Sequence, residues 1–239
     1  MASREGFGRI LAQIALVVAV ASIVLVLAAG PGTRLGLWHF RTGLGLLRWV
    51  FYGGLAGGVL GFAAVLLGGA RATAGLALFL ALGALAVPIA FRRQAAAVPR
   101  IHDITTDTQD PPRFDAVLPL RAGADNPPEY AGAEVAAEQR RGYPDLAGLT
   151  LALPPEQVFA RARQAVDDLG WALVAARPET GTIEATDTTF WFGFKDDVVI
   201  RIRPEGSGSR VDVRSKSRVG RSDVGANARR IRRLLDKLR

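Results

Sequence analysis

Long apolar runs dominate the first hundred residues of the chain. Three of them, residues 10–29, 49–70 and 72–91, contain no Asp, Glu or Lys. Each has about 20 residues, which as a helix rising 1.5 Å per residue spans roughly 30 Å, the thickness of a bilayer's hydrocarbon core. A cleaved signal peptide would have a shorter apolar run and would not explain three. The pattern therefore predicts three transmembrane helices, forming an all-α anchor over residues 1–92.

Glycines repeat along the second of these runs. Gly53, Gly57 and Gly61 recur at every fourth position, so they share one helix face and allow a neighbouring helix to approach closely. That neighbour is either another span of the same chain or the same span of a second copy, which would form a homodimer. Because the spans contain no acid and no lysine, they lack the usual carriers of a proton or ion pathway.

The pattern changes after residue 92. Residues 93–148 are rich in Pro, Ala, Asp and Thr and show no sustained period, which indicates an extended connector. His102, Asp103, Asp107 and Asp110, near its start, have the donor types of a hard-metal cluster. Asp and Thr beside a Pro-Pro pair more often form turns that bond their own backbone. We therefore interpret this segment as a series of turns.

Two amphipathic helices are predicted within residues 149–239. The first, residues 153–170, begins at a Pro-Pro pair, ends at Gly170 and repeats apolar residues at helical spacing. The second begins near Ser222 or Asp223, either of which is a good N-cap. Its apolar residues fall on one stripe. That stripe consists of Val224, Ala228, Ile231, Leu235 and Leu238.

Four runs between these helices have the composition of strands, and the last two form a hairpin around the turn EGSGS. If Arg203 faces Arg210, one face of the hairpin is apolar, while the other face pairs Arg201 with Asp212 and Asp197 with Lys216. One face is then expected to be buried. These elements predict an α+β domain, in which an antiparallel sheet has both helices packed on one face. The four runs are residues 171–176, 181–187, 192–204 and 209–219.

The same alternation, extended towards the N-terminus, makes a prediction for the aromatic residues before the hairpin. Phe190, Phe192 and Phe194 are expected to point inward, and Trp191 outward.

Charge is divided unevenly along the chain. The net charge of +8 belongs to the first hundred residues, which hold nine arginines and one acid. The remainder is neutral overall, because an acidic stretch, 101–200, balances a basic one, 201–239, and this predicts pairing within the folded domain. Nucleic-acid binding normally needs a net basic module and is therefore disfavoured. Contact of the basic end with anionic lipid headgroups stays open. The chain has no cysteine, which excludes disulfides and thiol chemistry.

Three motifs carry a resemblance. "ITTDTQDPP", "FGFKDDVVIRI" and "VDVRSKSRVGRSDVGANARRIRRLL", in this order, resemble the bacterial and plastid family of domains of unknown function numbered fourteen ninety-nine. The resemblance covers about residues 101–239, and the three spans lie outside it. It implies that the ITTD segment begins the family domain, so that the connector is docked on it. It implies no established reaction.

The polar residues of the last two motifs are the candidate ligand-binding site. One interpretation is a structural network that ties the last helix to the sheet and satisfies buried hydroxyls. The other is an anion pocket, in which Arg218 and the start of the last helix supply donors. The candidates are Asp196, Asp197, Arg201, Arg214, Ser215, Ser217, Arg218, Asp223, Asn227 and Arg230.

Catalysis would depend on Asp196 and Asp197, with His102, in a metal-dependent hydrolase. Adjacent residues on a strand point to opposite faces, so these two acids would not hold one metal together. We therefore interpret the chain as a non-enzymatic protein without a cofactor or metal. It is expected to bind an anionic ligand or a partner protein of the cell envelope.

The location follows from the spans, which make the lipid bilayer a partner. Of the arginines near the spans, three lie on the N-terminal side and six on the other, which favours a cytoplasmic C-terminal domain. Proteins that resemble this domain are often exported, lipid-anchored or lumenal, which implies the periplasm. We expect a multi-pass protein of the bacterial inner membrane with a periplasmic domain.

Overall fold

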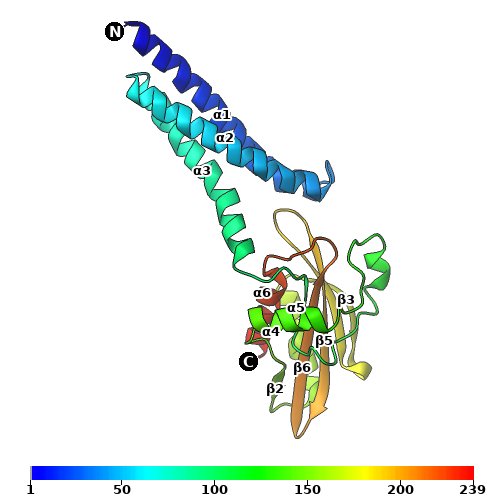
Figure 1. Cartoon of the computed structure of the whole chain (residues 1–239). Helices are drawn as coiled ribbons and strands as arrows, with labels where there is room; N and C mark the ends of the chain where they lie inside the picture. Colours follow the sequence, from blue (N-terminus) through cyan, green and yellow to red (C-terminus); the bar gives the residue numbers. More distant parts are fainter. Residues whose placement is uncertain (1) are drawn as a thin grey trace. The chain divides into compact units, whose positions relative to one another are not determined.

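A computed structural model describes residues 2–239 of the chain. It divides into two compact units (Figure 1). The first runs to Gln94 and includes the short segment Phe190–Gly193, and the second consists of Ala95–Thr189 and Phe194–Arg239.

The first unit is built from three long helices, α1 (Ala2–Arg34), α2 (Phe40–Leu66) and α3 (Arg71–Ala96). Each is long and apolar enough to cross a membrane, as predicted. Their outer surfaces carry exposed large apolar side chains, such as Val17 and Phe79, which are 68% and 73% exposed. In water such a surface would be unfavourable, whereas lipid tails are its natural surroundings.

The glycines of α2 face the other two helices of the same chain. Gly53 faces Ser22 of α1, and a Cβ at Gly57 would lie 3.5 Å from Ala19 of the same helix. Gly61 faces α3 instead. Packing among the three helices therefore accounts for the predicted glycine face, because a neighbouring helix occupies the space left by each missing side chain.

The second unit is an α+β domain with an antiparallel sheet, as predicted. The strand order is β1-β6-β5-β4-β3, and β2 lies beside β1 along the same edge of β6. All pairings are antiparallel. The strands are β1 (Asp103–Thr105), β2 (Leu149–Leu151), β3 (Ala172–Arg177), β4 (Thr182–Thr188), β5 (Lys195–Glu205) and β6 (Gly208–Ser217).

The predicted register of the β5–β6 hairpin is confirmed. Arg203 pairs with Arg210, Arg201 with Asp212, and Ile202 with Val211. A slip of one residue would turn every apolar side chain to the wrong face, so the hydrophobic pattern fixes this register strongly.

The two predicted helices, α5 (Pro155–Asp168) and α6 (Ala226–Leu238), both pack on the apolar face of the sheet (Figure 1). Their stripes meet Ile183, Ile200 and Val213 in one core in which these residues are fully buried. Each fully buried aliphatic side chain of this kind stabilises the fold by about 1.5–3 kcal/mol. The prediction of two helices on one face is therefore confirmed.

The N-cap of the last helix lies two or three residues after the predicted position. α6 begins at Ala226, after Gly225 in a left-handed conformation with φ 77°. Val224, expected in the helical stripe, also has a positive φ, 51°, which strains a β-branched residue. Asp223 still caps the helix from outside, because its carboxylate accepts from the backbone N–H groups of Gly225 and Asn227 at 2.8 and 2.9 Å.

The face of the hairpin that packs against the helices is buried, as expected, and its other face is covered as well. Asp197 and Asp212 are 0% exposed and Lys216 is 1% exposed, although all three point away from the helices. Residues 106–130, including the short helix η1 (Leu118–Arg121), cover this face. Glu184 fixes the covering segment, since its carboxylate accepts from three successive backbone N–H groups, those of residues 115–117.

The Pro-rich connector also contains a helix that its composition did not indicate, α4 (Ala133–Gly142). Gln139 of α4 bonds both backbone groups of Thr105, donating to the carbonyl at 2.6 Å and accepting from the N–H at 2.9 Å. Its side-chain amide thus occupies the position of a further strand beside β1 and satisfies an otherwise open edge. The predicted turn is confirmed at Asp107, whose carboxylate accepts from the N–H groups of Gln109 and Asp110.

The aromatic residues before the hairpin do not continue its alternation. β4 ends at Thr188 and β5 begins only at Lys195, so Phe190 and Phe192 lie in a loop. Phe190 is 92% exposed, and its predicted inward position is therefore wrong.

Candidate functional site

The ten candidate residues lie on both faces of the sheet. Asp196 and Asp197, adjacent on β5, point to opposite faces. Asp196 lies on the helix-covered face together with Ser215, Ser217, Asn227 and Arg230, and Asp223 caps α6 nearby. The face under residues 106–130 holds Asp197, Arg201, Arg214 and Arg218.

Asn227 joins α6 to β6 inside the core. Its side-chain amide donates to Ser217 Oγ at 3.1 Å and to the His102 carbonyl at 3.0 Å, and its Oδ1 accepts from Ser215 Oγ at 2.7 Å. Asn227 and Ser215 are both fully buried. Both amide hydrogens of Asn227 are therefore used within the fold, and none is left for a ligand.

Arg230 completes this network. Its guanidinium donates to Asp187 at 2.7 Å, to Asp196 at 2.6 Å and to Ser215 Oγ at 3.1 Å, and the residue is 4% exposed. The geometry is a closed network between helix and sheet, which was the structural alternative to an anion pocket. The network holds α6 against the sheet.

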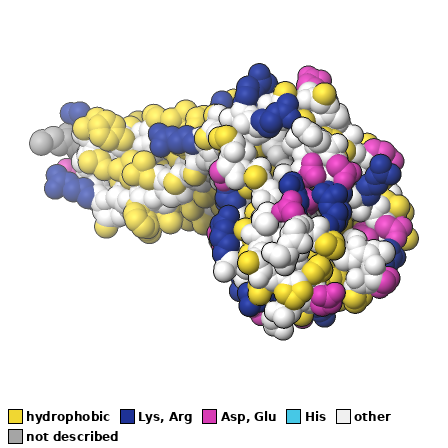
Figure 2. Space-filling model, turned by 90° about the horizontal axis from the view of Figure 1, so that it is seen from below, with side chains coloured by type: hydrophobic (Ala, Val, Ile, Leu, Met, Phe, Trp, Pro, Cys, Tyr) yellow, Lys and Arg dark blue, Asp and Glu magenta, His cyan; other side chains and the backbone are white. Residues whose placement is uncertain are grey.

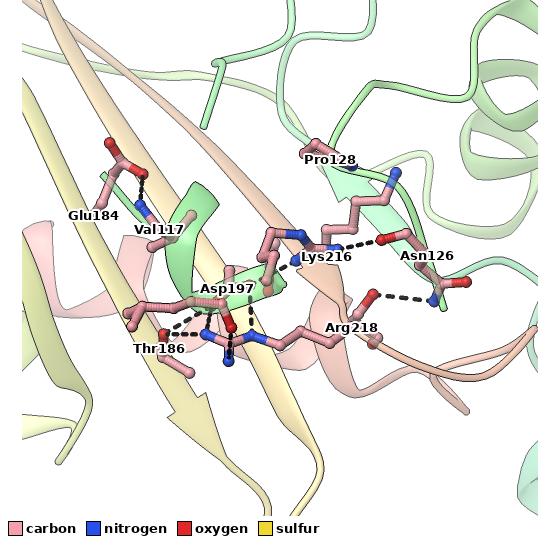
Figure 3. Close-up of polar contacts among 12 residues, drawn as sticks. Val117, Asn126, Pro128, Glu184, Thr186, Asp197, Lys216 and Arg218 are labelled. Atoms are coloured by element: carbon pink, nitrogen blue, oxygen red, sulfur yellow. Dashed lines mark hydrogen bonds and ion pairs between the residues drawn. The ribbon is translucent and has the colours of Figure 1, made fainter. Parts of the chain in front are cut away.

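Asp197 is the centre of a second network, on the opposite face (Figure 3). It accepts from Arg121 at 2.6 Å, from Arg218 at 2.7 and 2.9 Å and from Thr186 at 2.7 Å. Burial raises the pKa of Asp197, but the hydrogen bonds from Arg218 and Thr186 and the charge of Arg218 outweigh it and hold the pKa below its ordinary value. Arg218 also donates to the Leu120 carbonyl at 2.6 Å, which fastens η1 to the sheet.

Arg201 belongs to a third group, built around the buried Asp212. Asp212 accepts from Arg201 at 3.3 Å, from Arg203 at 3.0 Å and from Arg210 at 3.1 Å. Two further acids of the covering segment, Asp107 and Asp110, pair with Arg201 and Arg203 from outside. Three arginines thus meet these three acids, and Arg210 Nη1 also lies 3.7 Å from Glu205 Oε1.

Arg214 and Lys216 share one carboxylate. Arg214 binds Asp103 through two donors, both at 2.8 Å, and Lys216 Nζ lies 3.0 Å from the same carboxylate. All three residues are 1–2% exposed. Burial lowers the pKa of Lys216, and Asp103 opposes that shift. The triad carries a net positive charge, because two buried cations face one acid.

The guanidinium of Arg214 is held between two aromatic rings. Its Cζ lies 4.8 Å from the centroid of Phe114 and 5.4 Å from that of Tyr130. The carbonyls of Pro112 and Pro128 accept from it at 3.3 and 2.8 Å. Cation–π contacts of this kind add about 0.5–2 kcal/mol each, more when water is excluded.

The reasoning from sequence missed Phe114 and Tyr130, although the sequence contains a signal for them. Residues 110–114 read DPPRF and residues 126–130 read NPPEY, so that the same pattern of Asp or Asn, two prolines, a charged residue and an aromatic residue occurs twice. Each copy supplies one proline carbonyl and one ring to Arg214. The two segments therefore contact Arg214 in the same way.

A cavity of about 460 Å³ lies beside the guanidinium of Arg214 and the two rings that contact it. Its volume lies in the range of small-molecule sites, which is roughly 300–1,000 Å³. The wall is part apolar and part charged. It is formed by Gln109, Asp110, Pro111, Arg113, Phe114, Leu118, Pro128, Glu129, Tyr130 and Arg214.

Two polar groups of this wall are without a partner. Arg113 is exposed and makes no hydrogen bond or ion pair with any residue in the described range 2–239. The Tyr130 hydroxyl is buried and has no hydrogen-bond partner there either. Burial raises the pKa of Tyr130 to about 12, and the charge of Asp103 adds to that shift, so the hydroxyl keeps its proton and remains a donor.

The arrangement needed for a metal-dependent hydrolase is not found in residues 2–239. Asp196 and Asp197 bind different arginines on opposite faces of the sheet. No group of three His, Cys, Asp or Glu side chains in this range is close enough to hold a metal ion. Burial and the nearby charge of Lys216 lower the pKa of His102, and its carbonyl binds Asn227 and the Ser217 N–H.

The acidic and basic stretches of the sequence pair in the fold, as predicted. Asp145 binds Arg232 and Asp168 binds Lys237, in addition to the buried networks. Figure 2 shows the result, since Lys and Arg side chains alternate with Asp and Glu on the visible face of the domain.

Fold and site together define a class, a membrane-spanning protein that carries an α+β domain with an antiparallel sheet. The family model described as protein of unknown function (DUF1499) matches residues 103–238, more than half of the chain, and the chain belongs to that family. The resemblance identified from the motifs is therefore confirmed, and the three apolar helices lie outside the matched range. A search of curated proteins found no match.

Proposed function

We propose that this protein is a membrane-anchored, non-enzymatic binding protein whose α+β domain takes up a small anionic ligand in the cavity beside Arg214. The observation that carries the proposal is the buried triad next to the cavity, in which Arg214 and Lys216 both pair with the carboxylate of Asp103. A buried excess positive charge is unfavourable, and an anion placed beside it would relieve that cost.

The wall of the cavity indicates what kind of anion fits. Arg113 is an exposed residue of the wall and offers unused donors. Phe114, Pro111 and Leu118 provide apolar contact. These groups suit a phosphate or carboxylate that carries a flat apolar substituent.

Calorimetric titration of the full chain in detergent micelles with phenyl phosphate tests this proposal. We expect saturable binding, weakened about tenfold or more by Arg113→Ala, because a hydrogen bond to a charged group contributes about 1.5–3 kcal/mol. Arg141→Ala is the matched control, since Arg141 is also exposed but lies on α4, outside the cavity wall. Heat signals that do not saturate, or equal affinity for the two variants, would contradict the proposal.

We place the protein in the bacterial inner membrane with its domain in the periplasm, where an envelope protein is a second class of partner. The family resemblance supports this side, whereas the arginine count supports the cytoplasm. Topology reporters fused after Arg239 distinguish the two, because alkaline phosphatase is active only on the periplasmic side. An inactive phosphatase fusion beside an active cytoplasmic reporter would contradict our placement.

A further inference from the structure

The cavity beside Arg214 lies between two segments of the chain. Residues 109–118 supply one wall and residues 128–130 the other, and Arg214 of β6 belongs to the lining as well. A change in the position of either segment would therefore change the width of the cavity. The two segments differ in how they are held on the sheet.

The first wall is fixed by hydrogen bonds and by apolar packing. The carboxylate of Glu184 accepts from the backbone N–H groups of residues 115–117. Phe114 and Val117 form an apolar cluster with Val199 of β5, and each of the three is at most 7% exposed. Opening this wall would expose the cluster to water, so we expect the wall to stay in place.

The second wall belongs to residues 124–131, which contribute no side chain to the apolar clusters in the described part of the chain. Polar contacts hold this segment instead. Arg214 donates to the Pro128 carbonyl at 2.8 Å, and Lys216 donates to the Glu129 carbonyl at 2.6 Å. A segment with few buried apolar contacts opens at a low cost in free energy.

Asn126 attaches the same segment at a further point. Its backbone N–H donates to the Arg218 carbonyl (Figure 3). Its side-chain amide donates to the carbonyls of Ser217 and Gly220, each at 3.0 Å. These contacts join the segment to the end of β6 and to the residues that follow it, and they too are hydrogen bonds without apolar packing.

A glycine with a positive φ stands at each end of this segment. Gly123 has φ 83° and Gly132 has φ 85°. Gly132 also has ψ −158°, a combination that is essentially restricted to glycine. A Cβ at either position would meet no atom beyond its chain neighbours within 4 Å, so conformation and not space favours glycine there. Glycine absorbs the φ and ψ changes of a hinge at the lowest cost.

We propose that residues 124–131 form a lid on the cavity, which turns about Gly123 and Gly132 and closes over the bound anion. This proposal rests on the function proposed above, because the lid covers the same site. A ligand that touches residues 128–130 gains those contacts only when the lid is closed. Binding therefore shifts the lid towards its closed state, while residues 109–118 keep one position.

Distances between two spin labels measure the lid directly, because the chain has no cysteine of its own. Nitroxides are placed at Pro127→Cys in the lid and at Ser207→Cys in the β5–β6 turn, both of which are exposed. The control pair is Pro119→Cys with Ser207→Cys. Pro119 is an exposed proline of η1, next to the fixed wall, so each pair loses one exposed proline. Double electron–electron resonance is recorded on the full chain in detergent micelles, with and without phenyl phosphate.

Without ligand we expect the 127–207 distances to be spread roughly twofold more widely than the 119–207 distances, and phenyl phosphate should narrow them to the control width. Equal widths in the ligand-free chain would overturn the lid. Calorimetry on the same samples reports binding separately. Binding without narrowing would overturn the lid and leave the proposed function standing, whereas absence of binding would overturn both.

Gly123→Ala tests the hinge. A positive φ disfavours L-alanine, so closing the lid costs more, and we expect phenyl phosphate to bind roughly five- to thirtyfold more weakly. Gly170→Ala is the matched control, since Gly170 follows α5, outside the lid, with φ 72° and similar free space around an added Cβ. Equal affinities of the two variants would overturn the hinge.

Discussion

Replacing Asp103 with Asn should lower the free energy of unfolding of the α+β domain by about 3–5 kcal/mol, because the substitution leaves two buried cations without a counter-charge. Asp103 is 1% exposed and contacts Arg214 and Lys216 at 2.8 and 3.0 Å. Hydrogen exchange of the β6 amides, measured on the full chain in micelles, reports this value for the domain alone.

The loss of unfolding free energy caused by Asp103→Asn should become smaller as the pH rises above 7. Burial already lowers the pKa of Lys216, and loss of Asp103 removes the group that opposes the shift. Between this depressed folded pKa and the unfolded value near 10.4, the folded state binds fewer protons, so stability increases with pH. Asp236→Asn, which removes an exposed pair with Arg239, is the control and should cost under about 1 kcal/mol at every pH. A loss at Asp103 no larger than this control would contradict the role of the triad.

Replacing Arg230 with Met should cost a similar amount, about 3–5 kcal/mol, for the opposite reason. The change leaves Asp196, which is 2% exposed, without the guanidinium that pairs with it, and it frees Asp187. Because this network joins α6 to the sheet, exchange should accelerate first in the amides of α6.

A matched control lies two residues further along the same helix. Arg232 pairs with Asp145 at the surface, where the two side chains are 37% and 55% exposed. Arg232→Met should therefore change stability by less than about 1 kcal/mol. If both variants lose the same stability, burial does not govern the strength of these pairs, and our account of the network is wrong.

The fold was predictable from the sequence where local patterns agreed with one another. The register of β5 and β6 satisfies two conditions at once, since it brings Ile202 to Val211 on one face and Arg201 to Asp212 on the other. Residues 106–130, which cover one face of the sheet, have no such pattern of apolar and charged positions. Glu184 and Asp197 hold the covering segment through side-chain hydrogen bonds to partners more than sixty residues away in sequence. A repeating hydrophobic pattern cannot predict contacts of that kind.

The site was predictable only in part, because its residues meet by tertiary contact. Arg214 was among the candidates, but its neighbours Phe114 and Tyr130 lie in a region without periodicity. The repeated DPPRF and NPPEY segments were visible, yet a repeat alone does not show that both copies close on one arginine. Most other candidates were polar residues of buried networks, because sequence alone does not separate a charge paired inside from one that faces a cavity.

The central claim is that the domain binds an anion and does not transform it. Phosphorus NMR of phenyl phosphate mixed with the full chain in nanodiscs tests both parts at once. Our account predicts a saturable shift or broadening of the ester resonance that Arg113→Ala weakens, with no inorganic phosphate formed over time. A resonance that the protein leaves unchanged, or one replaced by that of inorganic phosphate, would contradict it.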